Sequence, residues 1–325
     1  MKTVLIDIRE IKKYYDVRTE ILAAKRDAVR AVDGVSLKIF RGETLGLVGE
    51  SGCGKSTLAR LLLRLETPTH GTILFEDRDI FKFKDKDLRT YRRNVQIIFQ
   101  DPYASLNPRR NAGSTIGEPL LVNNINNREG RAVEVLRIMN VVGLTEEQKD
   151  RYPHEFSGGQ RQRIGIARAI IMKPQLIVAD EPVSALDVSI QAQILNLLKE
   201  LQNEFNLTYM FISHDLSVVR HVSDRIAVMH LGRIVEMANN SELYEHPLHP
   251  YTIELLAAIP SPDPSKKKER AEREMRWNDG STGKCAFYPR CREKLDACDR
   301  EEPELMDVGD GHYVACHRAT QTPLL

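Results

Sequence analysis

The chain has 325 residues, of which 42% are hydrophobic, 29% charged and 6% aromatic, as in an ordinary soluble globular protein. Its formal net charge of +1 gives no support for bulk electrostatic binding to nucleic acid. No apolar run approaches the roughly 18–20 residues that cross a bilayer, and Asp7 interrupts any signal-peptide core, so we expect a cytoplasmic chain that can still dock on a membrane protein.

Short apolar segments alternate with helical patterns in the first half of the chain, which predicts an α/β domain. Residues 101–150 begin polar and turn-rich and then become helical. With the helix that follows them, they predict a helical subdomain of about 101–172, inserted between two strands. The other predicted elements of this half are strands at 44–49, 71–76 and 95–99 and a helix at 55–65.

The second half continues the α/β pattern as far as about residue 260. Strands are predicted at 175–180 and 209–213, and segments 225–230 and 233–237 predict a hairpin around a Leu-Gly turn. The charged, proline-flanked stretch 261–276 predicts a linker or a solvated helix. We therefore expect one domain over 1–260 and a linker with a small extension over 261–325. The predicted helix between strands 175–180 and 209–213 carries an apolar stripe of Ile190, Ile194, Leu197, Leu198, Leu201 and Phe205.

GESGCGKST at residues 49–57 matches G-x-x-x-x-G-K-[ST] between a predicted strand and a predicted helix. Glycines let the backbone N–H groups wrap phosphates without intruding side chains. Lys55 is expected to reach the β- and γ-phosphates, and the Ser56 hydroxyl to coordinate Mg²⁺. The alternative, a glycine-rich turn before a core helix, is disfavoured by the flanking elements. The expected nucleotide-binding residues here are Gly49, Glu50, Ser51, Gly52, Cys53, Gly54, Lys55, Ser56 and Thr57.

LIVADEP at residues 176–182 places two carboxylates at the end of a buried strand, where α/β sheets face their ligand crevice. Asp180 is expected to hold Mg²⁺ through water, and Glu181 to polarise the attacking water. Adjacent residues of a strand point to opposite sides, so the two carboxylates are expected to do different jobs. A solvated strand end is the alternative.

SGGQ, that is Ser157, Gly158, Gly159 and Gln160, precedes a helix with Ile164, Ala167 and Ile171 on one face. A helix start of this kind binds anions through free N–H groups, and Ser157 can cap it and also bond a phosphate oxygen. A helix of an inserted subdomain cannot easily reach its own chain's phosphate loop. We therefore expect it to contact ATP held by another chain, in a head-to-tail pair that encloses two nucleotides. A flexible turn is the alternative.

The motifs GESGCGKST, FQDP, FSGGQRQR, LIVADEP, SALD and SHD stand in the family's order over residues 49–215 and resemble the nucleotide-binding subunits of ATP-binding cassette (ABC) transporters. The resemblance implies an α/β P-loop NTPase cassette with an inserted helical subdomain, followed here by a small C-terminal extension with cysteines. Phe156 stands where many relatives have leucine, a mild departure.

The resemblance also implies roles for single residues. Gln100 matches the glutamine that senses Mg²⁺ and the attacking water, so Mg²⁺ is expected near Ser56, Gln100 and Asp180. His214 matches the switch histidine, which would bond the γ-phosphate and steady Glu181. A buried core histidine is the alternative for His214.

Three further assignments rest on the same resemblance. Ser184, Ala185, Leu186 and Asp187 match the D-loop that crosses the dimer interface, and SGGQ is the signature that contacts the partner's γ-phosphate. In KKYYDV, spacing favours Tyr15 over Tyr14 for stacking on adenine, with a surface tyrosine as the alternative. No motif departs from the catalytic pattern. Each ATP site of the pair is formed by two chains, and this chain is expected to supply functional residues to both sites.

QIIFQDPYASLNPR, SALDVSIQAQILNLL, HPLHPYT and the terminal cysteine segment resemble the second ATPase of oligopeptide and dipeptide importers. This implies an ATP-hydrolysing subunit, peripheral at the cytoplasmic face of the membrane, in a heterodimer with a second ABC ATPase. Two permeases, whose coupling helices would meet residues 103–108, and an extracytoplasmic substrate-binding protein complete the expected complex, without nucleic acid. Importers of nickel complexes, glutathione or sugars, a soluble ABC ATPase without a permease, and a metal-dependent redox sensor remain open.

Four cysteines near the end have the spacing C-x5-C-x6-C-x17-C: Cys285, Cys291, Cys298 and Cys316. Four thiolates can hold Zn²⁺ or an iron–sulfur cluster. The resemblance favours [4Fe–4S], with zinc or metal-free thiols as the alternatives. His312 and His317 are interpreted as surface residues rather than ligands. The segment is too short for a core of its own, so a metal would supply much of its folding energy.

Overall fold

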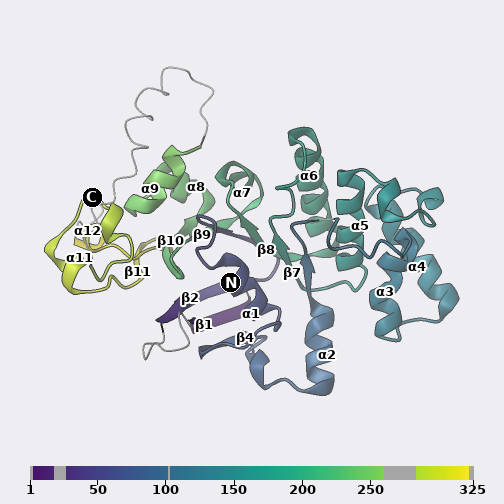
Figure 1. Ribbon diagram of the computed structural model, residues 1–325, viewed down its shortest axis with the longest axis horizontal. Helices are drawn as coiled ribbons and strands as arrows, with labels where there is room; N and C mark the ends of the chain where they lie inside the picture. Colours follow the sequence, from purple (N-terminus) through teal and green to yellow (C-terminus); the bar gives the residue numbers. More distant parts are fainter. Residues whose placement is uncertain (1–2, 18–26, 102, 260–282, 322–325) are drawn as a thin grey trace.

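A computed structural model describes residues 3–17, 27–101, 103–259 and 283–321 of the chain (Figure 1). The strands are β1 (Val4–Val17), β2 (Asp27–Phe40), β3 (Thr44–Val48), β4 (His70–Phe75), β5 (Arg78–Asp79), β6 (Val95–Ile98), β7 (Leu176–Asp180), β8 (Thr208–Ser213), β9 (Arg225–His230), β10 (Arg233–Asn239), β11 (Met306–Gly309) and β12 (His312–Val314). The helices are α1 (Lys55–Leu62), α2 (Asp85–Asn94), α3 (Ala112–Val122), α4 (Arg128–Val141), α5 (Gly158–Ile170), α6 (Val188–Phe205), α7 (Leu216–Val222), α8 (Asn240–Glu245), α9 (Pro250–Ala257), α11 (Asp296–Arg300) and α12 (His317–Gln321).

The larger sheet has the strand order β11-β12-β10-β9-β3-β8-β7-β6, and its strands from β9 to β6 are parallel. The central strands are apolar throughout because both of their faces are covered. Residues Leu176 and Val178 pack toward α1 and the second sheet, whereas Ile177 and Ala179 pack toward α5, α6 and α7. Parallel strands end at one edge, so the segments that follow β3, β6, β7 and β8 lie together there.

The second sheet has the order β2-β1-β4-β5 and is antiparallel. The strand expected at 71–76 is β4, which belongs to this sheet rather than to the parallel one. The two long strands β1 and β2 were not predicted from the sequence. Their pairing contains register shifts, one of them between Ile8 and Ile11, so the buried residues do not alternate regularly.

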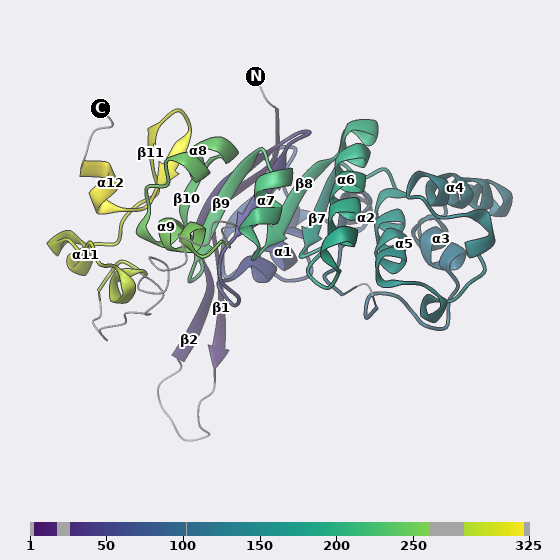
Figure 2. The same ribbon diagram turned by 90° about the horizontal axis from the view of Figure 1, so that it is seen from above.

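Helices α3, α4 and α5 lie between β6 and β7 in the chain and form a lobe at one end of the molecule (Figures 1 and 2). The predicted faces of two helices are buried as expected. Ile164, Ala167 and Ile171 of the α5 region lie in the same core as the apolar stripe of α6. None of the helices in the described ranges is long and apolar enough to span a bilayer.

The C-terminal segment, residues 283–321, is joined to the cassette rather than standing apart from it. Strand β12 pairs with β10, with Glu236 opposite Val314 and Met237 opposite Tyr313. Phe287 is buried in the core that α7 and α9 share. The segment therefore uses the cassette's core. The linker expected at 261–276 lies outside the described residues.

The prediction that His312 is a surface residue is wrong. Its side chain is 3% exposed, and its Nε2 lies 2.7 Å from Oε1 of Glu236, which is fully buried. Glu236 also accepts hydrogen bonds from the backbone N–H groups of Leu248 (2.7 Å) and His249 (3.0 Å). A buried carboxylate requires such partners, and the C-terminal segment supplies one of them.

Candidate active site

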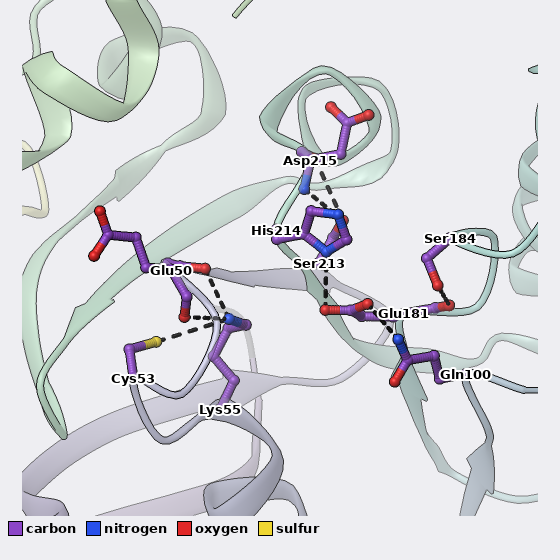
Figure 3. Close-up of polar contacts among 10 residues, drawn as sticks. Glu50, Cys53, Lys55, Gln100, Glu181, Ser184, Ser213, His214 and Asp215 are labelled. Atoms are coloured by element: carbon purple, nitrogen blue, oxygen red, sulfur yellow. Dashed lines mark hydrogen bonds and ion pairs between the residues drawn. The ribbon is translucent and has the colours of Figure 1, made fainter. Parts of the chain in front are cut away.

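The phosphate loop links β3 to α1 and closes around its own lysine (Figure 3). The Lys55 ammonium donates to the carbonyl oxygens of Gly49 (2.7 Å) and Glu50 (2.9 Å), and the residue is 5% exposed. Gly54 has φ +112°, and a Cβ added there would lie 2.1 Å from the Ala31 carbonyl oxygen. The loop thus presents a buried cation and the free N–H groups of a helix start, a combination that suits a phosphate.

Asp180 and Ser56 lie together beside this loop. Burial and the charge of Glu181 raise the pKa of Asp180, while a hydrogen bond from Ser56 and the charge of Lys55 oppose the rise. Mg²⁺ in nucleotide sites is usually held by one or two protein oxygens together with phosphate oxygens and water. A hydroxyl and a carboxylate at this place fit that donor set.

Glu181 is held by two residues that follow neighbouring strands (Figure 3). The Gln100 amide donates to Glu181 Oε2 at 2.8 Å, and His214 Nδ1 lies 3.0 Å from Oε1. The Glu181 side chain is 13% exposed, whereas that of His214 is 53% exposed. The alternative of a core histidine is therefore wrong. The structure brings all three predicted catalytic residues together.

The predicted reason why Asp180 and Glu181 differ needs correction. Strand β7 ends at Asp180, and Glu181 has the left-handed φ of +47°, so strand alternation does not separate the two side chains. The Glu181 N–H donates to the Ile212 carbonyl at 2.9 Å and holds the kink in place. A non-glycine residue in this region costs about 1–2 kcal/mol, and such strain is frequent at functional sites.

The signature is the start of helix α5 rather than a flexible turn. Ser157 is the N-cap: its hydroxyl accepts from the Gln160 N–H at 3.4 Å, and its own N–H donates to Gln160 Oε1 at 3.0 Å. A Cβ on Gly158 would lie 3.4 Å from the Leu186 side chain. The signature and the D-loop are therefore neighbours within one chain.

The predicted D-loop lies at the surface beside Glu181. Ser184, Ala185 and Asp187 are exposed, and the Ser184 hydroxyl donates to the Glu181 carbonyl at 3.1 Å. In both views β7 lies between α5 and α1, and in Figure 2 α6 lies between them as well (Figures 1 and 2). The fold does not bring the signature to the phosphate loop of its own chain.

Tyr15 lies on the phosphate-loop side of β1. Its hydroxyl bonds the Glu66 carboxylate, and burial, followed by this bond, raises its pKa, against a smaller opposing effect of Thr57 in the loop. Tyr14 instead donates to Asp33 at 2.5 Å. Neighbouring strand residues point to opposite sides. Of the two tyrosines, Tyr15 is therefore the one that faces α1.

The four cysteines lie in one part of the C-terminal segment. Burial raises the pKa of Cys285 and Cys291 to about 11, and the charges of the other thiols contribute to the rise. The N–H of Cys285 donates to the Cys298 carbonyl at 3.1 Å. Among the described residues, however, no three His, Cys, Asp or Glu side chains are placed to hold a metal ion. The predicted metal site is therefore not confirmed.

Two residues at the site were not predicted. Tyr251 of α9 accepts a hydrogen bond from the Glu50 N–H at 3.0 Å, and Arg290 forms an ion pair with the Glu50 carboxylate. Arg290 is 240 positions away from Glu50 in the chain. Tyr251 lies in HPLHPYT and Arg290 in the terminal cysteine segment, but these stretches only indicated the family branch and gave neither residue a role at the phosphate loop.

A cavity of about 1060 Å³ lies away from these motifs, between β1, β2, β10 and the C-terminal segment. Arg9, Asp33 and Arg225 are among its lining residues. Of the predicted site residues, only Cys285 borders it.

Comparison with family models gives two matches along the chain. Residues 32–184 match the model described as ABC transporter. Residues 235–298 match the model described as oligopeptide/dipeptide transporter, C-terminal region. The first includes the phosphate loop, Gln100, the signature and Glu181, and the second includes three of the four clustered cysteines.

Curated proteins and solved structures resemble the chain over most of its length. The oligopeptide transport ATP-binding protein AppF of Bacillus subtilis is 50% identical over 96% of this chain and 97% of its own. The dipeptide transport ATP-binding protein DppF of Escherichia coli is 47% identical over 98% and 95%. The ATP-binding cassette MJ0796, in a dimeric post-hydrolysis state with ADP and phosphate, gives a TM-score of 0.64 at 29% identity, over 73% of this chain and 99% of that one.

Proposed function

Because the chain belongs to the ATP-binding subunits of ABC transporters, in their oligopeptide/dipeptide branch, we propose that it is the ATPase that drives peptide import. The motif resemblance pointed to the same family. The observation that carries the activity is the arrangement in which Gln100 and His214 each bond one oxygen of Glu181. ABC importers of nickel, glutathione or sugars remain the main alternative.

The proposed chemistry is attack of water on the γ-phosphorus of ATP, which breaks its bond to the bridging oxygen and releases ADP and phosphate. Glu181 acts as general base, and Gln100 and His214 hold its two carboxylate oxygens in position. Lys55 and the loop N–H groups bind the phosphates. Ser56 and Asp180, with Gln100 nearby, would hold Mg²⁺, which would neutralise charge on the phosphate oxygens. Tyr15 stacks on the adenine.

The proposed assembly is a head-to-tail heterodimer with a second ABC ATPase. Its support is that the signature, residues 157–160, lies in the helical lobe and away from the phosphate loop of its own chain, while the D-loop, residues 184–187, is exposed. Each ATP would then lie between one chain's loop and the other chain's signature. Two permeases at the cytoplasmic face of the membrane, and a substrate-binding protein outside it, complete the importer.

The proposed division of the chain is a catalytic cassette over 1–260 and an extension over 261–325. For the extension we retain a metal centre at Cys285, Cys291, Cys298 and Cys316, [4Fe–4S] or zinc, supported by the number of thiols and their shared neighbourhood. Iron, acid-labile sulfide and zinc analysis of anaerobically purified protein tests it. Iron with sulfide supports the cluster, and zinc without sulfide supports the alternative metal. Absence of both metals from the protein contradicts the proposed metal centre.

The function is tested with Glu181→Gln in the full chain. Loss of the base should lower ATP turnover by about 10²–10³-fold, while ATP binding and an ATP-dependent dimer persist. Glu204→Gln makes the same chemical change at an exposed position of α6 and should leave turnover unchanged. Normal turnover in Glu181→Gln would contradict the assignment of the base. Copurification with permease subunits separates a transporter from an ABC ATPase that acts alone.

A further inference from the structure

Arg290 of the C-terminal segment contacts the phosphate loop directly. Its Nη1 donates to both carboxylate oxygens of Glu50, at 3.0 and 3.1 Å. Glu50 is the first residue after Gly49 in the loop, and its carbonyl oxygen accepts the Lys55 ammonium at 2.9 Å. Glu50 therefore connects two basic residues: its backbone carbonyl binds Lys55 of the loop, and its side chain binds Arg290.

Arg290 is itself held in place by three contacts. Its second terminal nitrogen binds Glu254 of α9, and its guanidinium lies 5.4 Å from the ring centroid of Phe287 and 6.0 Å from that of Tyr251. Phe287 and Tyr251 are buried. The Arg290 side chain is only 23% exposed, less than Glu50 at 44% and Glu254 at 43%. An arginine fixed in this way can hold a carboxylate in one position at a low cost in side-chain entropy.

The Glu50 carboxylate is an unfavourable group for a loop that binds a triphosphate, because like charges repel. In Figure 3 the Glu50 carboxylate points away from Lys55, and Arg290 binds both of its oxygens. The ion pair with Arg290 neutralises the charge of the carboxylate and keeps it pointing away from Lys55. The Tyr251 hydroxyl, which accepts the Glu50 N–H at 3.0 Å, fixes the backbone of the same residue.

We propose that Arg290 is a positioning residue for the phosphate loop: through Glu50 it sets the affinity of the cassette for ATP. This rests on the proposed function and deepens it, since it assigns to the C-terminal segment a part in nucleotide binding. Arg290 is followed directly by the buried Cys291, so the segment that carries the cysteines is also the one that reaches the loop. A change in this segment is thereby transmitted to the ATP site.

The test is a double-mutant cycle on the full-length chain, with ATP as the probe. Arg290→Met removes the charge and retains the apolar stem, and is combined with Glu50→Gln. The dissociation constant of ATP is measured at equilibrium, and kcat and KM by phosphate release. Arg290→Met should weaken ATP binding about 3- to 10-fold, as expected for a partly exposed charge pair, and raise KM by the same factor with kcat within about 2-fold.

Three comparisons distinguish positioning of the loop from mere support of the segment. In the Glu50→Gln background, Arg290→Met should cause no further weakening, because the partner charge is absent. Glu245→Gln makes the same chemical change at an exposed position of α8 and should leave the ATP affinity unchanged. Arg290→Lys keeps the charge and should restore at least half of the lost affinity.

The inference is overturned if Arg290→Met binds ATP like the wild type, or if it weakens binding equally in the wild-type and Glu50→Gln backgrounds. In that second case the arginine supports the segment rather than the loop. Absence of ATP binding by the wild-type chain contradicts the proposed function instead, so the two failures are distinguishable.

Discussion

The imidazole of His214 and the carboxylate of Glu181 lie 3.0 Å apart, Nδ1 to Oε1, at the ends of the neighbouring strands β8 and β7. The second oxygen of the same carboxylate accepts the Gln100 amide at 2.8 Å. Both oxygens of Glu181 are thus held by side chains that follow β6 and β8, the two strands on either side of β7. A carboxylate fixed from both sides needs little reorganisation before it accepts a proton.

His214→Ala should therefore lower kcat by about 10²-fold with little change in the KM for ATP, because the base loses one of its two supports. Steady-state phosphate release measures it. His221→Ala, at an exposed position of α7, is the control and should behave like the wild type. Equal kcat in His214→Ala and the control would contradict the positioning of Glu181 by this histidine.

Two glycines of the phosphate loop should respond differently to alanine. At Gly54 a Cβ would lie 2.1 Å from the Ala31 carbonyl oxygen, whereas at Gly52, with φ +82°, it meets nothing within 4 Å. Gly52→Ala has only the left-handed strain, about 1–2 kcal/mol. Gly54→Ala must also displace the backbone at Ala31, so we expect its free energy of unfolding to fall by about 3 kcal/mol or more. Urea unfolding without nucleotide measures both, and equal losses would contradict the close approach at Gly54.

Glu236 should be essential for docking of the C-terminal segment. Its fully buried carboxylate accepts three hydrogen bonds or ion contacts, including that of His312, so Glu236→Ala should lower the free energy of unfolding by about 3–5 kcal/mol. Glu242 lies 3.7 Å from the other nitrogen of His312 and is 44% exposed. Glu242→Ala should cost about 0–1 kcal/mol. Comparable losses in the two variants would show that the buried carboxylate has no special role.

Stability should fall with acid through His230. Burial, the largest cause, lowers the pKa of this ring from 6.5 to about 4, opposed by the charge of Glu50 and assisted by that of Arg290. Between these two pH values the unfolded chain binds the proton and the folded protein does not, so the free energy of unfolding decreases as the pH falls from 6.5 to 4. The loss is up to about 3 kcal/mol and stops below pH 4.

His230→Gln is the variant that isolates this contribution. The ring donates a hydrogen bond to the Ala286 backbone, and a glutamine amide can also donate but does not titrate. Urea unfolding at pH 4.0, 5.0, 6.0 and 7.5 should show a shallower decrease for the variant than for the wild type. Parallel pH profiles for the two proteins would mean that His230 does not remain neutral in the folded state.

The motifs were predictable because each one is contiguous. In the phosphate loop and the signature, glycine, lysine and a capping serine act through the local backbone that they themselves form, so their residue order already determines their chemistry. The apolar stripes of α5 and α6 were predictable for the same reason, since a helical period is a property of a short segment. Strands β1 and β2 were not predicted because their register shifts break the alternation by which strands are recognised.

The sequence by itself therefore determined an α/β nucleotide-binding cassette, its phosphate loop and its signature helix, and it predicted Glu181 as the catalytic carboxylate. Tertiary structure alone decided which residues meet: Gln100 and His214 on Glu181, His312 on the buried Glu236, and Arg290 on Glu50. These contacts join residues that are far apart in the chain. Their existence depends on strand order and on the packing of whole elements, which no short stretch of sequence contains.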